Sequence, residues 1–120
     1  MAPTTTIADD GQPHVFFVRP PDGATVTSPV TLELGALNFE VEAAGQARPG
    51  AGHLHVMVDA TCLVPGTEIP RDAAHVHLGN GQLQTTLVLA PGPHHLCLQA
   101  GDGLHKALPI TDELDLTVSA

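Results

Sequence analysis

The chain has no tryptophan and no tyrosine, and only three of its 120 residues are phenylalanine. Its core must therefore be mainly aliphatic. Basic residues are also scarce. The chain has four Lys plus Arg and 13 Asp plus Glu, which gives a formal net charge of −9. Phosphate backbones and anionic lipid headgroups are bound by basic patches, so this balance argues against nucleic acid and membrane surfaces as partners. A metal cation is the natural partner of so acidic a chain.

The chain also has no apolar run near the roughly 18 residues that a membrane-spanning helix needs. Residues 1–13 lack the basic start and apolar centre of a signal peptide, which taken literally indicates a cytosolic protein. However, this Ala, Pro and Thr-rich beginning is typical of a mature exported protein after removal of its leader. We therefore expect a periplasmic or extracellular protein with a flexible segment at 1–13 and a single domain at 14–120.

Cysteine is limited to Cys62 and Cys97, which do not have the C-x-x-C spacing of redox and zinc motifs. A disulfide between them is the simplest interpretation, and it would persist only in an oxidising compartment. Two buried free thiols are the alternative, which the sequence leaves open. A disulfide would agree with export.

Short strands separated by Gly and Pro turns make up the pattern of the chain, and no stretch has the 3.6-residue period of a helix. The pattern predicts an all-β fold, namely an immunoglobulin-like antiparallel β-sandwich of about seven strands. In such a sandwich the third and sixth strands lie side by side and antiparallel. The expected strands cover residues 14–19, 30–42, 53–59, 75–78, 83–89 and 94–100, with a last strand that contains Leu114, Leu116 and Val118.

The second of these strands changes the parity of its apolar residues. Those up to Leu34 share one face, whereas those from Leu37 onwards have the other parity. A β-bulge at Gly35–Ala36 would keep both sets facing inward.

Histidine is abundant, with eight residues, and four of them form two His-x-His pairs, His53/His55 and His75/His77, in expected strands. Residues i and i+2 of a strand stand on one face about 7 Å apart, so two such imidazoles can converge on one ion. The opposite parity, which includes Leu54 and Val56, faces the core. The pairs therefore predict a metal site, and the alternative is a solvated outer face on which histidine happens to be common.

The predicted topology adds a fifth histidine to this face. Because the sixth strand runs antiparallel to the third, the loop after it returns towards the start of the third strand. This brings Asp102 and His105 near His53 and His55, so His105 is the next candidate ligand. Whether the strand of His75 and His77 pairs with the third strand, which builds one site, or joins the other sheet is left open.

Three further side chains on this face have two interpretations each. Met57 is a candidate soft axial ligand or a packed side chain, and Asp59 and Asp102 are candidates for orienting imidazoles, although turn chemistry also explains Asp102. The remaining histidines are expected outside the site because they lie at the starts of the first and sixth strands: His14, His94 and His95.

Several ordered motifs resemble a known family. They are an opening F-x-x-P-x-D-G-A-x-V-x-S-P, a G-H-x-H-x-x-x-D strand, an I-P followed by an H-x-H-x-G-x-G-Q hairpin, and a final G-D-x-x-H. Over roughly residues 14–120 the chain resembles the exported bacterial domain-of-unknown-function 4399 family. The resemblance implies export and a small β-sandwich, but no activity. Copper-zinc superoxide dismutases also present His-x-His on a sandwich strand, but the chain does not match their bridging-histidine metal loop.

Ligand chemistry narrows the metal, because several imidazoles without a thiolate or a carboxylate cluster suit copper or zinc. The Irving–Williams order favours copper. We expect an exported copper-binding protein for sequestration or delivery, whose partner is a metal donor or acceptor protein. The alternatives are a non-catalytic interaction module with surface histidines and a metal-dependent redox enzyme. Motifs of nucleophilic catalysis such as G-x-S-x-G are absent.

Overall fold

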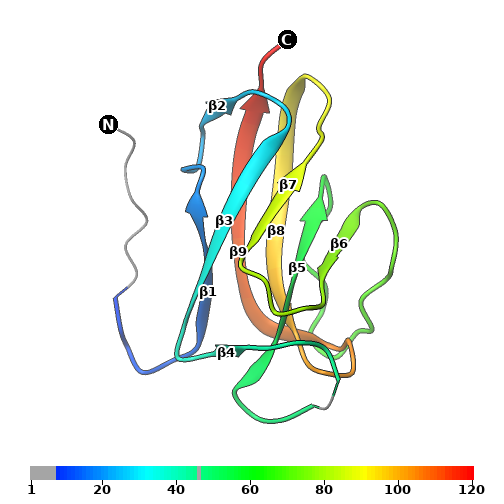
Figure 1. The fold of residues 1–120 in the computed structure, drawn as a ribbon. Coiled ribbons are helices and arrows are strands. Elements are labelled where there is room, and N and C mark those ends of the chain that lie inside the picture. The colour runs from blue at the N-terminus through cyan, green and yellow to red at the C-terminus, as the bar shows by residue number, and fades with distance from the viewer. Residues whose placement is uncertain (1–7, 46) are drawn as a thin grey trace.

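The structure is a computed structural model, and it describes residues 8–45 and 47–120. These residues contain no helix, and so none that could cross a membrane. Figure 1 shows their strands, which are β1 (His14–Arg19), β2 (Thr25–Val26), β3 (Val30–Leu37), β4 (Glu40–Val41), β5 (Ala51–Val58), β6 (His75–Leu78), β7 (Gln84–Leu87), β8 (Gly92–Gly101) and β9 (Ala107–Val118).

The strands form two packed sheets. The smaller sheet has the order β1-β3-β7, and the larger has the order β2-β9-β8-β5-β4, with β6 also paired to β5. These orders match strands A-B-E and G-F-C of the immunoglobulin sandwich. The predicted all-β sandwich is therefore confirmed, including the antiparallel pairing of the third and sixth long strands, β5 and β8. It is not wholly antiparallel, because the two-residue strands β2 and β4 pair in parallel with β9 and β5.

Alternating residues of both sheets build the core between them. Leu54 and Val56 of β5 and Leu96 and Leu98 of β8 are fully buried, as the parity of their strands predicts. The rest of the buried set is almost entirely aliphatic, as expected from the composition: Val15, Phe17, Val30, Leu32, Leu34, Phe39, Leu78, Leu87, Leu89, Ala100, Leu114, Leu116 and Val118.

The predicted bulge at Gly35–Ala36 is wrong. The register between β1 and β3 shifts instead between Phe17 and Arg19, while Gly35 pairs regularly with Phe16. A Cβ on Gly35 would lie 2.5 Å from Cε2 of Phe16, so glycine is needed there for close packing. The expected strand at 30–42 is broken by Asn38, whose φ of 56° turns the chain between β3 and β4. This turn brings Phe39 and Val41 to the core, whereas Leu37, which lies before the turn, does not join it.

The segment before β1 contacts the turn that follows β3. Residues 1–7 of the expected flexible segment lie outside the described residues. Within residues 8–13, Asp9 Oδ1 accepts a hydrogen bond of 2.8 Å from Asn38 Nδ2. This contact joins the segment to the turn after β3.

A second layer lies on the outer face of the larger sheet. It is the connection between β5 and β6, residues 59–74, which we call the cover loop. Ile69 of this loop packs with Met57, Cys97 and Ala107 in a second buried cluster. Backbone hydrogen bonds of 2.8 Å tie the loop to the start of β9, from Gly66 N to Ala107 O and from Ala107 N to Thr67 O.

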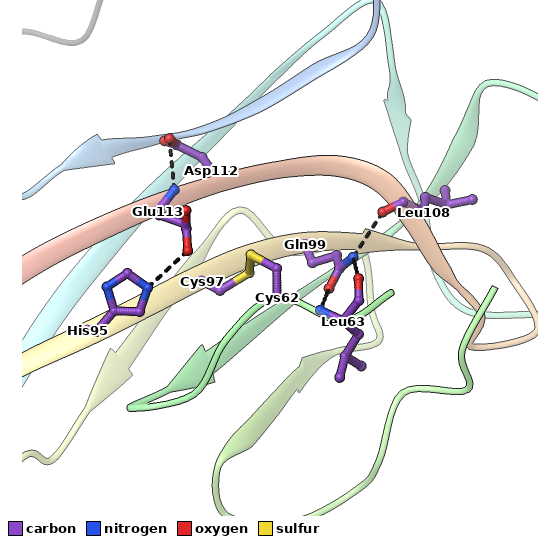
Figure 2. Close-up of a disulfide and its surroundings, with 8 residues drawn as sticks. All are labelled: Cys62, Leu63, His95, Cys97, Gln99, Leu108, Asp112 and Glu113. Carbon is purple, nitrogen blue, oxygen red and sulfur yellow. Dashed lines mark hydrogen bonds and ion pairs between the residues drawn. A yellow bond between two sulfur atoms is a disulfide. The ribbon is translucent and has the colours of Figure 1, made fainter. Parts of the chain in front are cut away.

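A disulfide fastens the beginning of the cover loop to β8. Cys62 and Cys97 are bonded, with their Cα atoms 5.5 Å apart, which confirms the predicted bridge (Figure 2). Beside it, the fully buried Gln99 donates to Leu63 O at 2.9 Å and accepts from Leu63 N at 2.7 Å. The face that carries the histidines is therefore covered over part of its area.

Candidate metal centre

Four histidines converge on the outer face of the larger sheet, beside the cover loop. His53 and His55 come from β5, His77 from β6, and His105 from the connection between β8 and β9. One ring nitrogen of each lies within 4.8 Å of those of the other three. The ring centroids are between 4.6 Å (His53 and His55) and 6.1 Å (His55 and His105) apart.

Strand pairing accounts for this convergence. The edge strand β6 pairs with β5 in a register that places His77 opposite His55, and the two rings stack with centroids 5.0 Å apart. The question that the sequence left open is thereby answered, since both His-x-His strands belong to one sheet. On the other side, His53 pairs with Gly101, after which the chain turns back and places His105 against His53.

The backbone of His105 has an uncommon conformation. Its φ of 64° lies in the left-handed region, which few residues other than glycine adopt. Two hydrogen bonds hold it, from His105 N to Asp102 O at 3.0 Å and from Ile69 N to His105 O at 2.8 Å. Such conformations persist where the surroundings enforce them, often at functional sites.

Burial favours the neutral form of three of the four imidazoles, because it lowers the pKa of each. His53 and His55 are 0% and 1% exposed, so desolvation of the charged form, followed by repulsion from neighbouring imidazoles, lowers their pKa to about 4 and about 3. Desolvation also lowers the pKa of His77. The neutral imidazole is the form that binds metal. The alternative of solvated histidines is wrong for His53 and His55, because the sheet face that they occupy is covered.

Three rings of the cluster each have one buried nitrogen that is left unpaired. Nδ1 of His53, Nδ1 of His55 and Nε2 of His77 are buried and have no hydrogen-bond partner among the described residues. Bonds of 2.0 to 2.1 Å to a tetrahedral ion separate ligand nitrogens by roughly 3.3 Å. His53 Nε2 and His105 Nδ1 are already 3.3 Å apart, whereas the widest separation, 4.8 Å, needs modest closure. The residues present therefore fit a metal ion.

Two glycines leave room for the rings. A Cβ on Gly79 would lie 2.7 Å from Cε1 of His77, and one on Gly101 would lie 2.8 Å from Cε1 of His55. Neither distance is compatible with a real side chain. The space that the rings of His55 and His77 occupy therefore depends on glycine at both positions.

Not every candidate ligand joins the cluster. His75 faces Met57 across the strand pair, and its Nδ1 bonds to Asp72 Oδ1 at 2.6 Å. Met57 is fully buried in the second apolar cluster. Asp102 closes the turn before His105, since its Oδ1 accepts hydrogen bonds from Leu104 N and Lys106 N.

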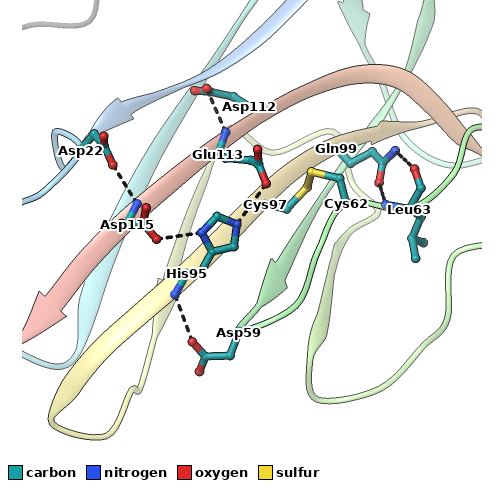
Figure 3. A network of polar contacts seen from close by, with 10 residues as sticks. All are labelled: Asp22, Asp59, Cys62, Leu63, His95, Cys97, Gln99, Asp112, Glu113 and Asp115. Carbon is teal, nitrogen blue, oxygen red and sulfur yellow. Dashed lines mark hydrogen bonds and ion pairs between the residues drawn. A yellow bond between two sulfur atoms is a disulfide. The ribbon is translucent and has the colours of Figure 1, made fainter.

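The histidines expected outside the site lie outside it. His94 donates from Nδ1 to Asp59 Oδ2 and from Nε2 to Ala90 O, both at 2.7 Å, so Asp59 does not orient the cluster. His95 likewise contacts the carboxylates of Asp115 at 2.8 Å and Glu113 at 3.0 Å (Figure 3). These hydrogen bonds raise the pKa of both rings.

His14 also lies outside the cluster. Its Nε2 contacts Asp10 Oδ1 at 2.8 Å at the start of β1.

Two residues at the site were not singled out from the sequence. Arg71 of the cover loop contacts His105, with Nη2 2.7 Å from Nε2. Gln99 fastens the cover loop, as Figure 2 shows. The available signals were the scarcity of basic residues and the amide of Gln99 in an otherwise apolar strand segment, LCLQA.

The chain belongs to the family described as "Domain of unknown function (DUF4399)", whose profile matches residues 32–119. This confirms the resemblance seen in the motifs, although the match is shorter than 14–120. The family carries no assigned function. A comparison with curated proteins gave no match.

One solved structure resembles the fold, an X-ray structure of the endo-beta-1,4-mannanase from Thermotoga petrophila. The TM-score is 0.53 at 18% sequence identity, and the match covers 92% of this chain. The chain spans only 20% of the mannanase chain. This likeness supports the fold alone.

Proposed function

We propose that this protein is an exported metal-binding protein that holds one copper ion in its four-histidine cluster, for sequestration or delivery. The observation that carries the proposal is the convergence of four imidazoles, since one ring nitrogen of each lies within 4.8 Å of those of the other three. Leaving a buried polar group unpaired costs about 1 to 3 kcal/mol, so the unpartnered ring nitrogens of His53, His55 and His77 mark a cluster that stability alone does not explain.

The donor set selects the metal. All four ligands are nitrogen donors of intermediate softness, and the disulfide removes both thiols from competition. At such a site Cu(II) binds more strongly than Zn(II) by the Irving–Williams order. Zinc is the alternative, because a closed set of four ligands is typical of structural zinc sites.

The proposed location is the periplasm or the extracellular space. A disulfide between Cys62 and Cys97 is consistent with an oxidising compartment. In that location a metal donor or acceptor protein is the expected partner. Holding an ion is favoured over catalysis because His53 and His55 are buried beside the cover loop, which limits the access of a substrate.

The test is calorimetric titration of the metal-stripped protein with Cu(II) and with Zn(II) at pH 7.5, with electron paramagnetic resonance of the copper sample. We expect one ion per chain and nitrogen hyperfine structure. The double variant His53→Ala/His55→Ala should lose this binding. The matched control is His94→Ala/His95→Ala, which removes the same number of imidazoles outside the cluster and should retain it.

A second variant protects the test against misfolding. His77→Ala/His105→Ala removes the two partly exposed members of the cluster and should also lose binding while the circular dichroism stays unchanged. Stoichiometric binding in both cluster variants would overturn the proposal. Weak binding at several sites in the unaltered protein would do the same and would favour an interaction module.

A further inference from the structure

Arg71 of the cover loop contacts one member of the histidine cluster. Its Nη2 lies 2.7 Å from Nε2 of His105. A guanidinium group has donors only, so Nε2 of His105 must be the acceptor. A neutral imidazole has one protonated and one unprotonated nitrogen, and the proton of His105 is therefore on Nδ1.

That proton points into the cluster. His105 Nδ1 lies 3.3 Å from His53 Nε2, which accepts from it. The hydrogen bonds thus run from Arg71 to His105 to His53. They place a proton between two of the four nitrogens on which an ion would have to converge.

A metal bond to His105 is incompatible with the Arg71 contact at either ring nitrogen. If the ion binds Nδ1, the proton leaves that atom through solvent and Nε2 takes one up, so that Nε2–H faces the N–H groups of Arg71 and cannot accept. If the ion binds Nε2, it needs the lone pair and the space that Arg71 occupies. In both cases the count of protons on the neutral ring is unchanged and the arginine side chain must move.

We propose that Arg71 is an affinity-determining latch, whose contact with His105 and the binding of metal by His105 exclude each other. The inference rests on the proposed function of the cluster. Arg71 is free to leave because its side chain is exposed, whereas the neighbouring Ile69 is buried and its N–H is bonded to His105 O. Release of the latch therefore leaves the cover loop in place.

The latch also has an electrostatic consequence. Its guanidinium is a fixed positive charge beside the proposed ion, and it opposes the entry of a cation until it swings out towards solvent. An acidic chain with a net charge of −9 attracts cations, while this arginine limits how tightly one cluster holds them.

The first test compares the affinity for Zn(II) in competition titrations of the unaltered protein, Arg71→Met and Arg48→Met. Arg71→Met removes the donor and the charge and should bind about tenfold more tightly, since a charged hydrogen bond no longer competes. Arg48 is the matched control, because its guanidinium is paired with Glu40 and Glu42 rather than with a histidine, and its substitution should leave the affinity unchanged.

The second test separates the latch from simple charge repulsion and needs no variant. Nuclear magnetic resonance of the ¹⁵N-labelled unaltered protein should show His105 protonated on Nδ1 and close to Arg71 without metal. One equivalent of Zn(II) should abolish the contact between the two side chains and change the ¹⁵N shifts of the His105 ring.

The outcomes are distinguishable. Stoichiometric zinc binding with the Arg71 contact intact, or with unchanged affinity in Arg71→Met, would overturn the latch and leave the proposed function standing. Absence of stoichiometric binding of both Zn(II) and Cu(II) by the unaltered protein would overturn both.

Discussion

Three imidazoles of the cluster are not explained by stability alone. Each has a buried ring nitrogen without a partner among the described residues, namely those of His53, His55 and His77. In a core selected for stability alone, such atoms would be paired or replaced by apolar groups. Their neutrality comes from burial, which lowers each pKa. The same burial makes the stability of the metal-free protein depend on pH.

The metal-free protein should become less stable as the pH falls below about 6.5. The folded-state pKa of His55, about 3, lies below the unfolded value of 6.5, so the unfolded chain takes up a proton that the folded one excludes. The stability due to this histidine is complete above pH 6.5 and is lost as the pH falls towards the folded pKa. Urea unfolding at pH 7 and at pH 5 measures the loss.

His55→Gln isolates this contribution. Between pH 7 and pH 5 its loss of stability should be smaller than that of the unaltered protein by about 2 kcal/mol, at 1.36 kcal/mol per pKa unit. The comparison is needed because His94 and His95 have raised pKa values and act in the opposite direction, stabilising the fold below their folded pKa. Equal pH dependence in the two proteins would refute the buried, neutral state of His55.

Substitution of Gly79 tests whether metal binding needs the space beside the ring of His77. In Gly79→Ala the new Cβ would lie 2.7 Å from Cε1 of His77, which must then rotate away from the other imidazoles. Because His77 is only half-buried, the fold should survive while the metal affinity falls by about tenfold or more, which is 1.4 kcal/mol. Titration calorimetry measures the change.

Gly45→Ala is the control for this substitution. A Cβ at Gly45 meets nothing within 4 Å, and this glycine does not have a positive φ. The metal affinity of Gly45→Ala should equal that of the unaltered protein. An equal loss in both variants would show that the space beside His77 is irrelevant.

Among the elements, the cover loop determines the environment of the cluster. The disulfide closes a chain separation of 35 residues between Cys62 and Cys97. Its removal in Cys62→Ser/Cys97→Ser should lower the stability by about 3 to 4 kcal/mol, because the unfolded chain gains freedom. Urea unfolding tests this change.

Hydrogen exchange of the same variant locates its effect. The amides of Gly66, Ile69 and Ala107, which hold the loop to the start of β9 and to His105, should exchange faster than those of the β5–β8 pair. Uniform acceleration over the whole sandwich would contradict a local role of the disulfide.

The strands were largely predictable from the sequence, whereas their covering was not. β1 and β6 have the expected bounds, since alternation of apolar residues between Pro and Gly turns marks strands directly. Parity also placed His53 and His55 away from the main core. Parity does not say what lies over a face, and the cover loop has no periodicity, so the burial of these two histidines was not foreseen.

Other errors have local causes. Gly35 was interpreted as a bulge because sequence cannot separate a glycine needed for backbone geometry from one that makes space for a ring, here that of Phe16. His75 and His77 have the same parity, but only His77 lies opposite His55 in the register of β6. Arg71 was missed because its partner, His105, is distant in the sequence and the loop between them was unpredictable.

In the molecule as a whole, the sandwich brings together side chains from three separate segments of the chain. His105 could be placed beside His53 from topology alone, because antiparallel β5 and β8 return the chain to the same end of the sheet. The net charge of −9 agrees with a cation as partner. The four-histidine cluster is the point at which fold, burial and charge favour the same ligand.

Anomalous diffraction from crystals grown with one equivalent of Cu(II) or Zn(II) tests this claim most directly. We expect one strong peak per chain, about 2.0 to 2.1 Å from a ring nitrogen of each of the four clustered histidines. These are His53, His55, His77 and His105. A principal peak at His14, His75, His94 or His95, with none between the clustered imidazoles, would contradict it.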